Sequence, residues 1–260
     1  MKSRGASPAS AALARRAVRA SELAPASASA EEPLAFAAGL YRAQAELAGV
    51  IAAGPLTGVL ESDLDRFAGE LAAVVRYAAE RGPPGLAGQA RELSDERARL
   101  LGWWSGDRSG RTDYLARSLL RPYAEVLAAA GVRPEPGGSA TGCSFCGGPA
   151  WIAWRRAEPG ESGAARFLGC ALCAGEWKVN RILCAACGEE DPHKQANFQS
   201  ERYPAVRLET CESCRAYVKS IDLTGDARAI PEVDDLCSLS MDLWAVEQGY
   251  TRLEPSIAGI

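Results

Sequence analysis

The sequence of 260 residues predicts an α+β fold with three parts: an all-helical N-terminal bundle, two tandem cysteine-rich modules and a C-terminal helix. Three observations lead to this prediction. Apolar residues before residue 132 recur at intervals of three and four, the period of a helix with one buried face. Eight of the nine cysteines then form four Cys-x-x-Cys pairs. The helical period returns near the C-terminus.

The composition is that of a globular protein, with 47% hydrophobic and 24% charged residues. A chain of this length is expected to hold two domains. No stretch approaches the ~20 apolar residues that span a bilayer, so we expect no membrane insertion.

The first 30 residues carry five basic side chains and one acidic one, including the adjacent pair Arg15-Arg16. Such a segment could be an export signal, but residues 17–30 are mostly Ala, Ser and Pro and lack a strongly apolar core. We therefore predict a disordered tail over residues 1–30 and a cytoplasmic protein. Cytoplasmic thiols stay reduced, so paired cysteines favour a metal over disulfides.

Residues 31–132 are expected to form the helical domain. Four segments carry the helical pattern, over about residues 33–51, 62–81, 86–104 and 112–130. Pro122 lies inside the last one, so this helix should kink or divide there. Short connections imply antiparallel neighbours in a bundle. The region contains no catalytic constellation.

Residues 133–142 have the composition of a linker. The first four-cysteine metal module is then expected over residues 143–180 and the second over residues 181–222. Short strands are expected over residues 150–154, 165–169 and 202–210. Each would bring a distant cysteine pair back to face its partner.

The cysteine pairs form a repeat. They are Cys143/Cys146, Cys170/Cys173, Cys184/Cys187 and Cys211/Cys214, and the second two pairs follow the first two at an offset of 41 residues. Each Cys-x-x-Cys turn offers half of a tetrahedral S4 site. The equal spacing favours sequential pairing over a cross-brace, in which alternate pairs share a metal. The modules would then be rubredoxin-like or zinc-ribbon units, with one metal ion in each.

Spacing does not distinguish iron from zinc, because four thiolates accept either. A closed S4 site has no open position for water, which disfavours hydrolysis. One alternative is that both ions only stabilise a region with a small core. Gly147 and Gly188 follow the second cysteine of their pairs, where positive φ is expected.

The remaining candidate residues favour structural roles. His193 is the only histidine and lies in a polar loop, so we expect an exposed residue rather than a ligand. The tryptophans are expected to pack in the core. We therefore predict no catalytic residues, no further cofactor site and no enzyme activity.

Charge argues against nucleic acid as a partner. Residues 143–214 carry eight basic and nine acidic side chains, and residues 222–260 carry two basic and eight acidic ones. A surface that binds a phosphate backbone has the opposite balance.

Residues 223–260 should form a loop and a packing helix, which begins near Val233 and ends near Gln248. Its apolar arc is wide, so we expect a mostly buried helix with Cys237 in the core. The helical domain and the metal modules are expected to have separate cores.

The sequence resembles the formate dehydrogenase accessory protein family, FdhE, from about residue 34 to the end. The resemblance is carried by the four cysteine pairs and by the segments Ser118–Leu127, Phe167–Trp177, Arg181–Gly188, Val206–Leu223 and Val233–Tyr250. It implies a cytoplasmic, chaperone-like protein without turnover. Such a protein binds the catalytic subunit of formate dehydrogenase during maturation.

The resemblance also implies that the eight cysteines bind two metal ions per chain, with iron in rubredoxin-like sites favoured and zinc as the alternative. A second hypothesis is a rubredoxin-like electron carrier that acts on the client enzyme. A third, weaker one is a zinc-ribbon nucleic-acid binder. The sequence leaves a homodimer open.

Overall fold

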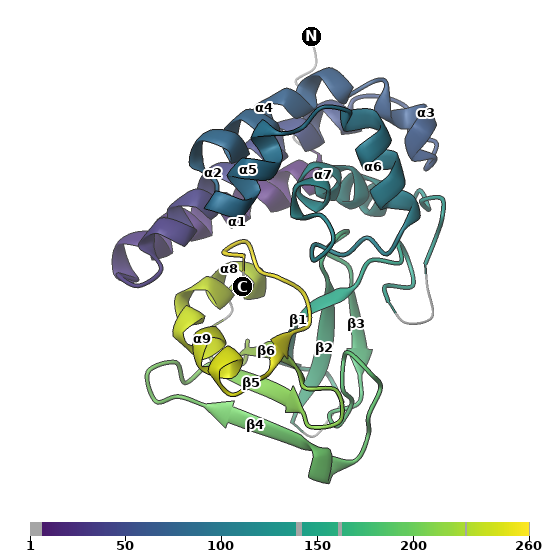
Figure 1. The fold of residues 1–260 in the computed structure, drawn as a ribbon. Helices are drawn as coiled ribbons and strands as arrows, with labels where there is room; N and C mark the ends of the chain where they lie inside the picture. Colours follow the sequence, from purple (N-terminus) through teal and green to yellow (C-terminus); the bar gives the residue numbers. More distant parts are fainter. Residues whose placement is uncertain (1–6, 139–141, 161–162, 227, 260) are drawn as a thin grey trace.

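A layer of helices lies over a curved β-sheet, and the C-terminal helices cover one face of that sheet (Figure 1). The computed structural model describes residues 7–138, 142–160, 163–226 and 228–259. The predicted α+β fold is confirmed, with helices first, then a sheet region that carries both cysteine groups, and a helix near the C-terminus.

The helical layer contains α1 (Pro8–Leu23), the 3₁₀ turn η1 (Ala24–Ala26), α2 (Glu31–Ala52), α3 (Leu60–Leu64), α4 (Ala68–Arg81), α5 (Pro84–Arg91), α6 (Glu96–Ser105) and α7 (Tyr114–Ala130). The single helix predicted over residues 86–104 is therefore wrong. The chain breaks after Arg91, and α6 starts anew because the Asp95 side chain accepts a hydrogen bond from the Ala98 amide at 3.0 Å.

Pro122 does not divide α7. A proline has no N–H to donate, which leaves the carbonyl of Ser118 without its helical partner. The Gln44 side-chain amide on α2 donates to that carbonyl at 2.7 Å. A tertiary contact thus replaces the missing bond, and it ties α2 to the centre of α7.

The disordered tail predicted over residues 1–30 is wrong for the described part of that range. Ser7 caps α1, where its Oγ accepts from the Ser10 amide at 3.1 Å, and Leu13 is fully buried. Small side chains dominate α1, so the sequence offered little apolar signal, although small residues allow α1 to pack closely on α2. Residues 1–6 lie outside the described residues.

A buried ionic cluster also holds α1 in place. Arg16 on α1 donates to Glu125 on α7 at 2.7 Å and pairs with Glu232, while Arg121 donates to Glu125 at 2.8 Å and also pairs with Glu232. Burial would raise the pKa of Glu232, but Arg121 and Arg16 outweigh it and lower this pKa below its usual range. The cluster joins both ends of the chain to α7.

The sheet consists of β1 (Ala150–Ala157), β2 (Ala164–Cys170), β3 (Glu176–Val179), β4 (Gln195–Gln199), β5 (Val206–Cys211), β6 (Ala216–Asp222) and β7 (Thr251–Arg252). Its order is β3-β2-β1-β6-β5-β4, with β7 beside β6. Each cysteine module supplies three antiparallel strands, and the parallel pair β1·β6 joins the two modules. The two modules therefore share one sheet.

This sheet is strongly curved, and β4 and β5 cross the direction of β2 and β3 steeply (Figure 1). Arg166 on β2 contacts Glu209 on β5 at 2.7 Å, although β1 and β6 lie between them in the strand order. Strands are spaced about 4.8 Å apart, so a flat sheet would hold β2 and β5 about 14 Å apart. The curvature creates a concave face between the modules.

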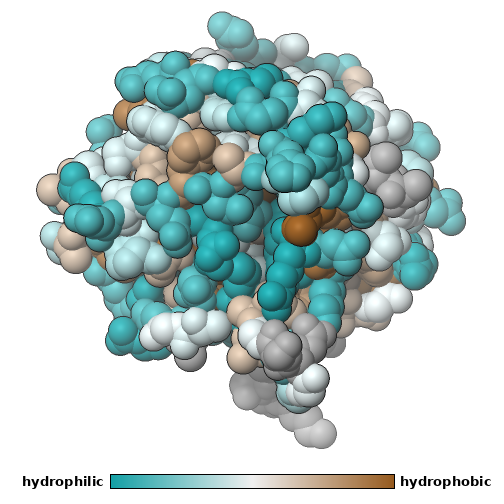
Figure 2. Space-filling model, turned by 90° about the horizontal axis from the view of Figure 1, so that it is seen from below, coloured by the Kyte–Doolittle hydropathy of each residue, from teal (hydrophilic) through white to brown (hydrophobic). Residues whose placement is uncertain are grey.

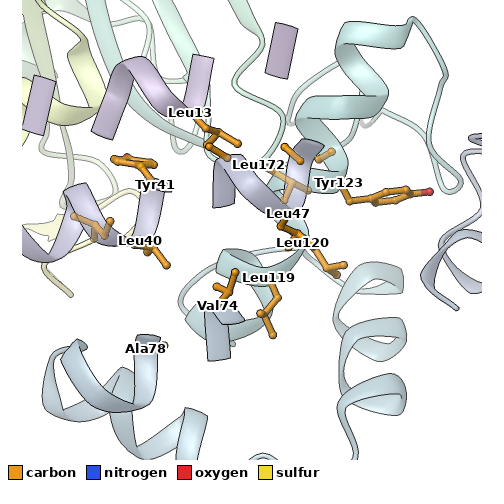
Figure 3. Close-up of a cluster of buried hydrophobic side chains, with 14 of the residues drawn as sticks. Leu13, Leu40, Tyr41, Leu47, Val74, Ala78, Leu119, Leu120, Tyr123 and Leu172 are labelled. Carbon is orange, nitrogen blue, oxygen red and sulfur yellow. The ribbon is translucent and has the colours of Figure 1, made fainter. Parts of the chain in front are cut away.

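The separate cores expected for the helical and metal-binding parts are wrong for the first cysteine group, whereas most of the sheet packs in a cluster of its own that contains Trp151, Phe167 and Tyr217. Leu172, in the second cysteine turn, packs among side chains of the helices such as Leu13 and Leu47 (Figure 3). The first cysteine group belongs to the same apolar cluster. The predicted linker is also fixed, because the Glu135 amide donates to the Gly58 carbonyl at 2.8 Å; residues 139–141 of it lie outside the described residues.

The C-terminal helix predicted over residues 233–248 is interrupted. It divides into α8 (Pro231–Asp234), the 3₁₀ turn η3 (Asp235–Ser238) and α9 (Leu239–Glu247). The buried ammonium of Lys219 donates to the Asp235 carbonyl at 2.7 Å and to the Asp242 carboxylate at 2.5 Å, which fixes the turn. The expectation of a mostly buried helix fails at Leu243 and Val246, which are 53% and 52% exposed.

The face seen from the sheet side is largely hydrophilic, with small separate hydrophobic spots (Figure 2). Within the described residues, no helix combines the length and apolar character needed to cross a membrane.

A pair of substitutions on α1 tests whether this helix belongs to the core. Leu13→Ala should lower the free energy of unfolding by about 2–5 kcal/mol, because the side chain is fully buried. Val18→Ala on the same helix should change it by less than about 0.5 kcal/mol, because Val18 is 57% exposed. Urea unfolding of both variants measures the difference. Equal, small effects would mean that α1 is not packed on the core.

Candidate metal centres

Two groups of four cysteines converge at the ends of the strands. Cys143 and Cys146 precede β1 and meet Cys170 and Cys173 at the end of β2. The second group consists of Cys184, Cys187, Cys211 and Cys214, which lie between β3 and β4 and at the end of β5. The structure thus brings the pairs together sequentially and not as a cross-brace.

All four Cys-x-x-Cys turns share one backbone conformation. The residue after the second cysteine has a positive φ in each turn: 72° at Gly147, 56° at Ala174, 76° at Gly188 and 57° at Arg215. Glycine adopts this conformation without strain, whereas Ala174 and Arg215 adopt it at a cost. The sequence identified the two glycines, but only the structure shows the same conformation at the other two turns.

The sulfur positions fit a tetrahedral metal ion. In the first group, Cys143 and Cys173 Sγ lie 3.6 Å apart and Cys146 and Cys170 Sγ 3.5 Å apart. The corresponding distances in the second group are 3.7 and 3.8 Å. Within each group all four sulfurs lie within 4.8 Å of one another. A tetrahedral ion with bonds of about 2.3 Å requires sulfurs about 3.8 Å apart, so both groups could hold a metal.

Backbone amides point at the sulfurs. The Gly148 amide donates to Cys146 Sγ at 3.4 Å, and the Leu172 amide donates to Cys170 Sγ at 3.4 Å. In the second group the Ala186 amide donates to Cys184 Sγ at 3.4 Å. Such N–H groups stabilise thiolate charge, and they orient each sulfur toward the centre of its group.

The two groups differ in exposure. All four cysteines of the first group are buried, and they adjoin the helical core. Cys187 and Cys214 of the second group are exposed. An ion in the second site would therefore lie close to solvent, whereas one in the first would be enclosed by protein. Sequence spacing is identical in both and could not reveal this difference.

Arg108 is a neighbour of the first group that the sequence analysis missed. It is 3% exposed, and its guanidinium donates to the carbonyl of Cys146, to the Trp104 carbonyl at 2.6 Å and to the Pro136 carbonyl at 2.8 Å. Burial lowers the pKa of Arg108, while Cys146 and Cys170 oppose this shift. A cation here offsets the excess negative charge of four thiolates, and it connects the helical layer to the site.

Burial raises the pKa of the Cys170 thiol well above its usual range, whereas hydrogen bonds with the other three cysteines lower the pKa of Cys143. Metal ligation needs the thiolate, so binding of an ion to this group releases protons at neutral pH. Metal affinity of the buried site should consequently depend strongly on pH.

The other candidate residues lie away from both groups. His193 is exposed in the 3₁₀ turn η2 (Pro192–Lys194), as expected for a residue that is not a ligand. Cys237 is partly buried against the helical core, where it lies 3.5 Å from Ser27 Oγ. Among the tryptophans, Trp103, Trp104, Trp151 and Trp154 are buried.

Comparison with known proteins shows which proteins this chain resembles. A model described as "FdhE, C-terminal domain" matches residues 182–257. The crystal structure of the FdhE protein from Pseudomonas aeruginosa covers 95% of this chain and 94% of its own, with a TM-score of 0.68 and 25% identity. The resemblance to the FdhE family is confirmed. The fold is thus similar to that of the FdhE crystal structure.

Curated relatives support the same assignment. An FdhE homolog from Pseudomonas putida is 31% identical over 216 residues, which cover 78% of this chain and 65% of the relative. One from Aquifex aeolicus is 34% identical over 117 residues, or 45% of this chain and 41% of the relative. The chain thus spans less than two thirds of the length of these FdhE homologs.

Matched serine substitutions test the unequal burial of the two groups. Cys146→Ser places a hydroxyl in the fully buried site within the helical core, so it should reduce both metal content and the thermal stability of the helices. Cys187→Ser, its counterpart in the repeat, should remove one metal ion with a smaller loss of helix stability. Metal analysis and thermal melting followed by far-UV circular dichroism measure both effects. Identical melting curves for the two variants would contradict the shared core.

Proposed function

We propose that this protein is a cytoplasmic accessory protein for formate dehydrogenase, which binds the catalytic subunit during maturation and has no turnover of its own. The observation that carries the proposal is the FdhE fold, matched over 95% of the chain, together with both cysteine groups. The sequence motifs that resemble the family surround those same cysteines.

We further propose that the eight cysteines hold two metal ions, with iron favoured and zinc as the alternative. The sulfur distances of 3.5–3.8 Å support a four-thiolate ligand set in both groups. An ion in the first group would stabilise the contact between the sheet and the helical layer, since Leu172 and the four cysteines pack there. The bound ion would supply structural stability and, if iron, a one-electron couple.

Copurification tests the accessory function. The tagged chain, produced anaerobically with a formate dehydrogenase catalytic subunit, should retain that subunit on the affinity resin. The same preparation with an unrelated molybdenum enzyme subunit as prey is the control. Absence of the formate dehydrogenase subunit under both reducing and oxidising conditions would refute the proposal.

A second candidate function is a rubredoxin-like electron carrier that acts on the client enzyme. The exposure of Cys187 and Cys214 favours it, because electron transfer requires a metal site close to the surface. The second cysteine group meets this requirement, while the first is enclosed.

Metal content separates the two functions. Protein purified anaerobically from its own host should contain about two irons per chain and show sulfur-to-iron charge-transfer absorbance after oxidation. Under the carrier hypothesis this absorbance disappears when the iron is reduced and returns when it is reoxidised. Cys187→Ser should remove the half of the absorbance that comes from the exposed site. Two zinc ions and a colourless protein would exclude the carrier and leave the accessory function intact.

A further inference from the structure

A pocket on the concave face of the sheet lies between the two cysteine modules. Its volume is about 360 Å³, and among the described residues it is lined by Arg155, Ala164, Arg166, Arg181, Ile182, Asn197, Arg207 and Glu209. Four of these eight residues are arginines and only one is acidic. This concentration of positive charge lies within a region that is acidic as a whole.

The strand register brings like charges together in this pocket. Arg155 on β1 lies directly opposite Arg166 on β2. Like charges at directly opposite positions of an antiparallel pair are destabilising. Arg166 is compensated by Glu209, at 2.7 Å, and by the carbonyls of Asn180 and Leu183. Arg155 has no such set of close acceptors among the described residues.

Three polar atoms at this face are buried without a hydrogen-bond partner among the described residues: Arg155 Nε, Arg207 Nε and Ser220 Oγ. Ser220 lies opposite Arg207 in the register of β5 and β6, so its side chain is on the same face. Arg155 reaches a carboxylate of Asp222 only at 3.6 Å, and no described residue forms an ion pair with Arg207. An unsatisfied buried donor is costly, so an acceptor that reaches the two guanidinium groups would be stabilised there.

We propose that this pocket binds the phosphate group of a small molecule. Guanidinium groups bind phosphate through charge-assisted, often bidentate hydrogen bonds. The Glu209 carboxylate is already occupied by Arg166, whereas Arg155 and Arg207 each present an unused N–H from different strands. A tetrahedral oxyanion in the pocket can accept from both guanidinium groups. A volume of about 360 Å³ is also within the range of small-molecule sites.

The pocket adjoins the exposed cysteine group. Arg166 and Glu209 also line a smaller cavity that is bordered by Cys184 and Cys211. The ion pair of Arg166 and Glu209 therefore separates the oxyanion pocket from the second metal site. A ligand bound there would lie on the module joint, next to the more accessible metal site.

Titration calorimetry of the metal-loaded protein with inorganic phosphate, at constant ionic strength and neutral pH, tests the proposal. The wild type should bind phosphate saturably and acetate more weakly. Arg207→Gln should weaken phosphate binding about tenfold or more, because it removes a charged donor with no other ion-pair partner among the described residues. Arg207→Lys keeps the charge and loses the planar donor pair. Its affinity for phosphate should therefore lie between those of the wild type and Arg207→Gln.

Arg228→Gln is the matched control, because Arg228 is an exposed arginine outside the pocket, with 84% of its side chain accessible. It should bind phosphate as the wild type does. Circular dichroism and metal content confirm that each variant is folded. No saturable binding by the wild type, unchanged binding by Arg207→Gln, or acetate binding as tight as phosphate would overturn the proposal.

Discussion

The closure of the first cysteine group inside the helical core is the constraint on which the rest of the structure depends. Four sulfurs lie within 4.8 Å of one another, and the turn that carries two of them inserts Leu172 between the helices. This arrangement fixes the first strand hairpin against α7 and α1. Because β1 also pairs with β6, the second module is positioned by the same contact. The first cysteine module and the helices are therefore one packed unit.

Two buried clusters of charged side chains add further contacts between secondary-structure elements. Arg16, Arg121, Glu125 and Glu232 form a buried cluster that joins α1, α7 and α8. A second cluster around Lys219 holds the turn before α9. Loss of one partner from such a cluster leaves an uncompensated buried charge, which destabilises strongly. The clusters thus fix how the two ends of the chain meet the central helix.

The internal repeat gives two four-cysteine groups that share the same spacing and turn conformation but differ in burial. The first is enclosed by the helical layer and has a buried cation, Arg108, beside it. The second lies at the far side of the sheet, where two of its cysteines are exposed. A structural role suits the enclosed site, and the exposed site has the access that exchange of electrons or contact with a partner requires. Curvature of the shared sheet adds the arginine-lined pocket between the modules.

The sequence by itself determined the helical and cysteine-rich parts, the four turns and their sequential pairing, because these features depend on local spacing and periodicity. Sequence-based prediction failed where the local structure depends on a contact with a residue distant in sequence. The short apolar residues of α1 gave no strong pattern, yet α2 and the Arg16 cluster hold that helix in place. Gln44 supplies the bond that keeps α7 continuous at Pro122. Only the tertiary structure could show that one cysteine group is buried and the other exposed, since burial depends on which surfaces meet and not on the spacing of the ligands.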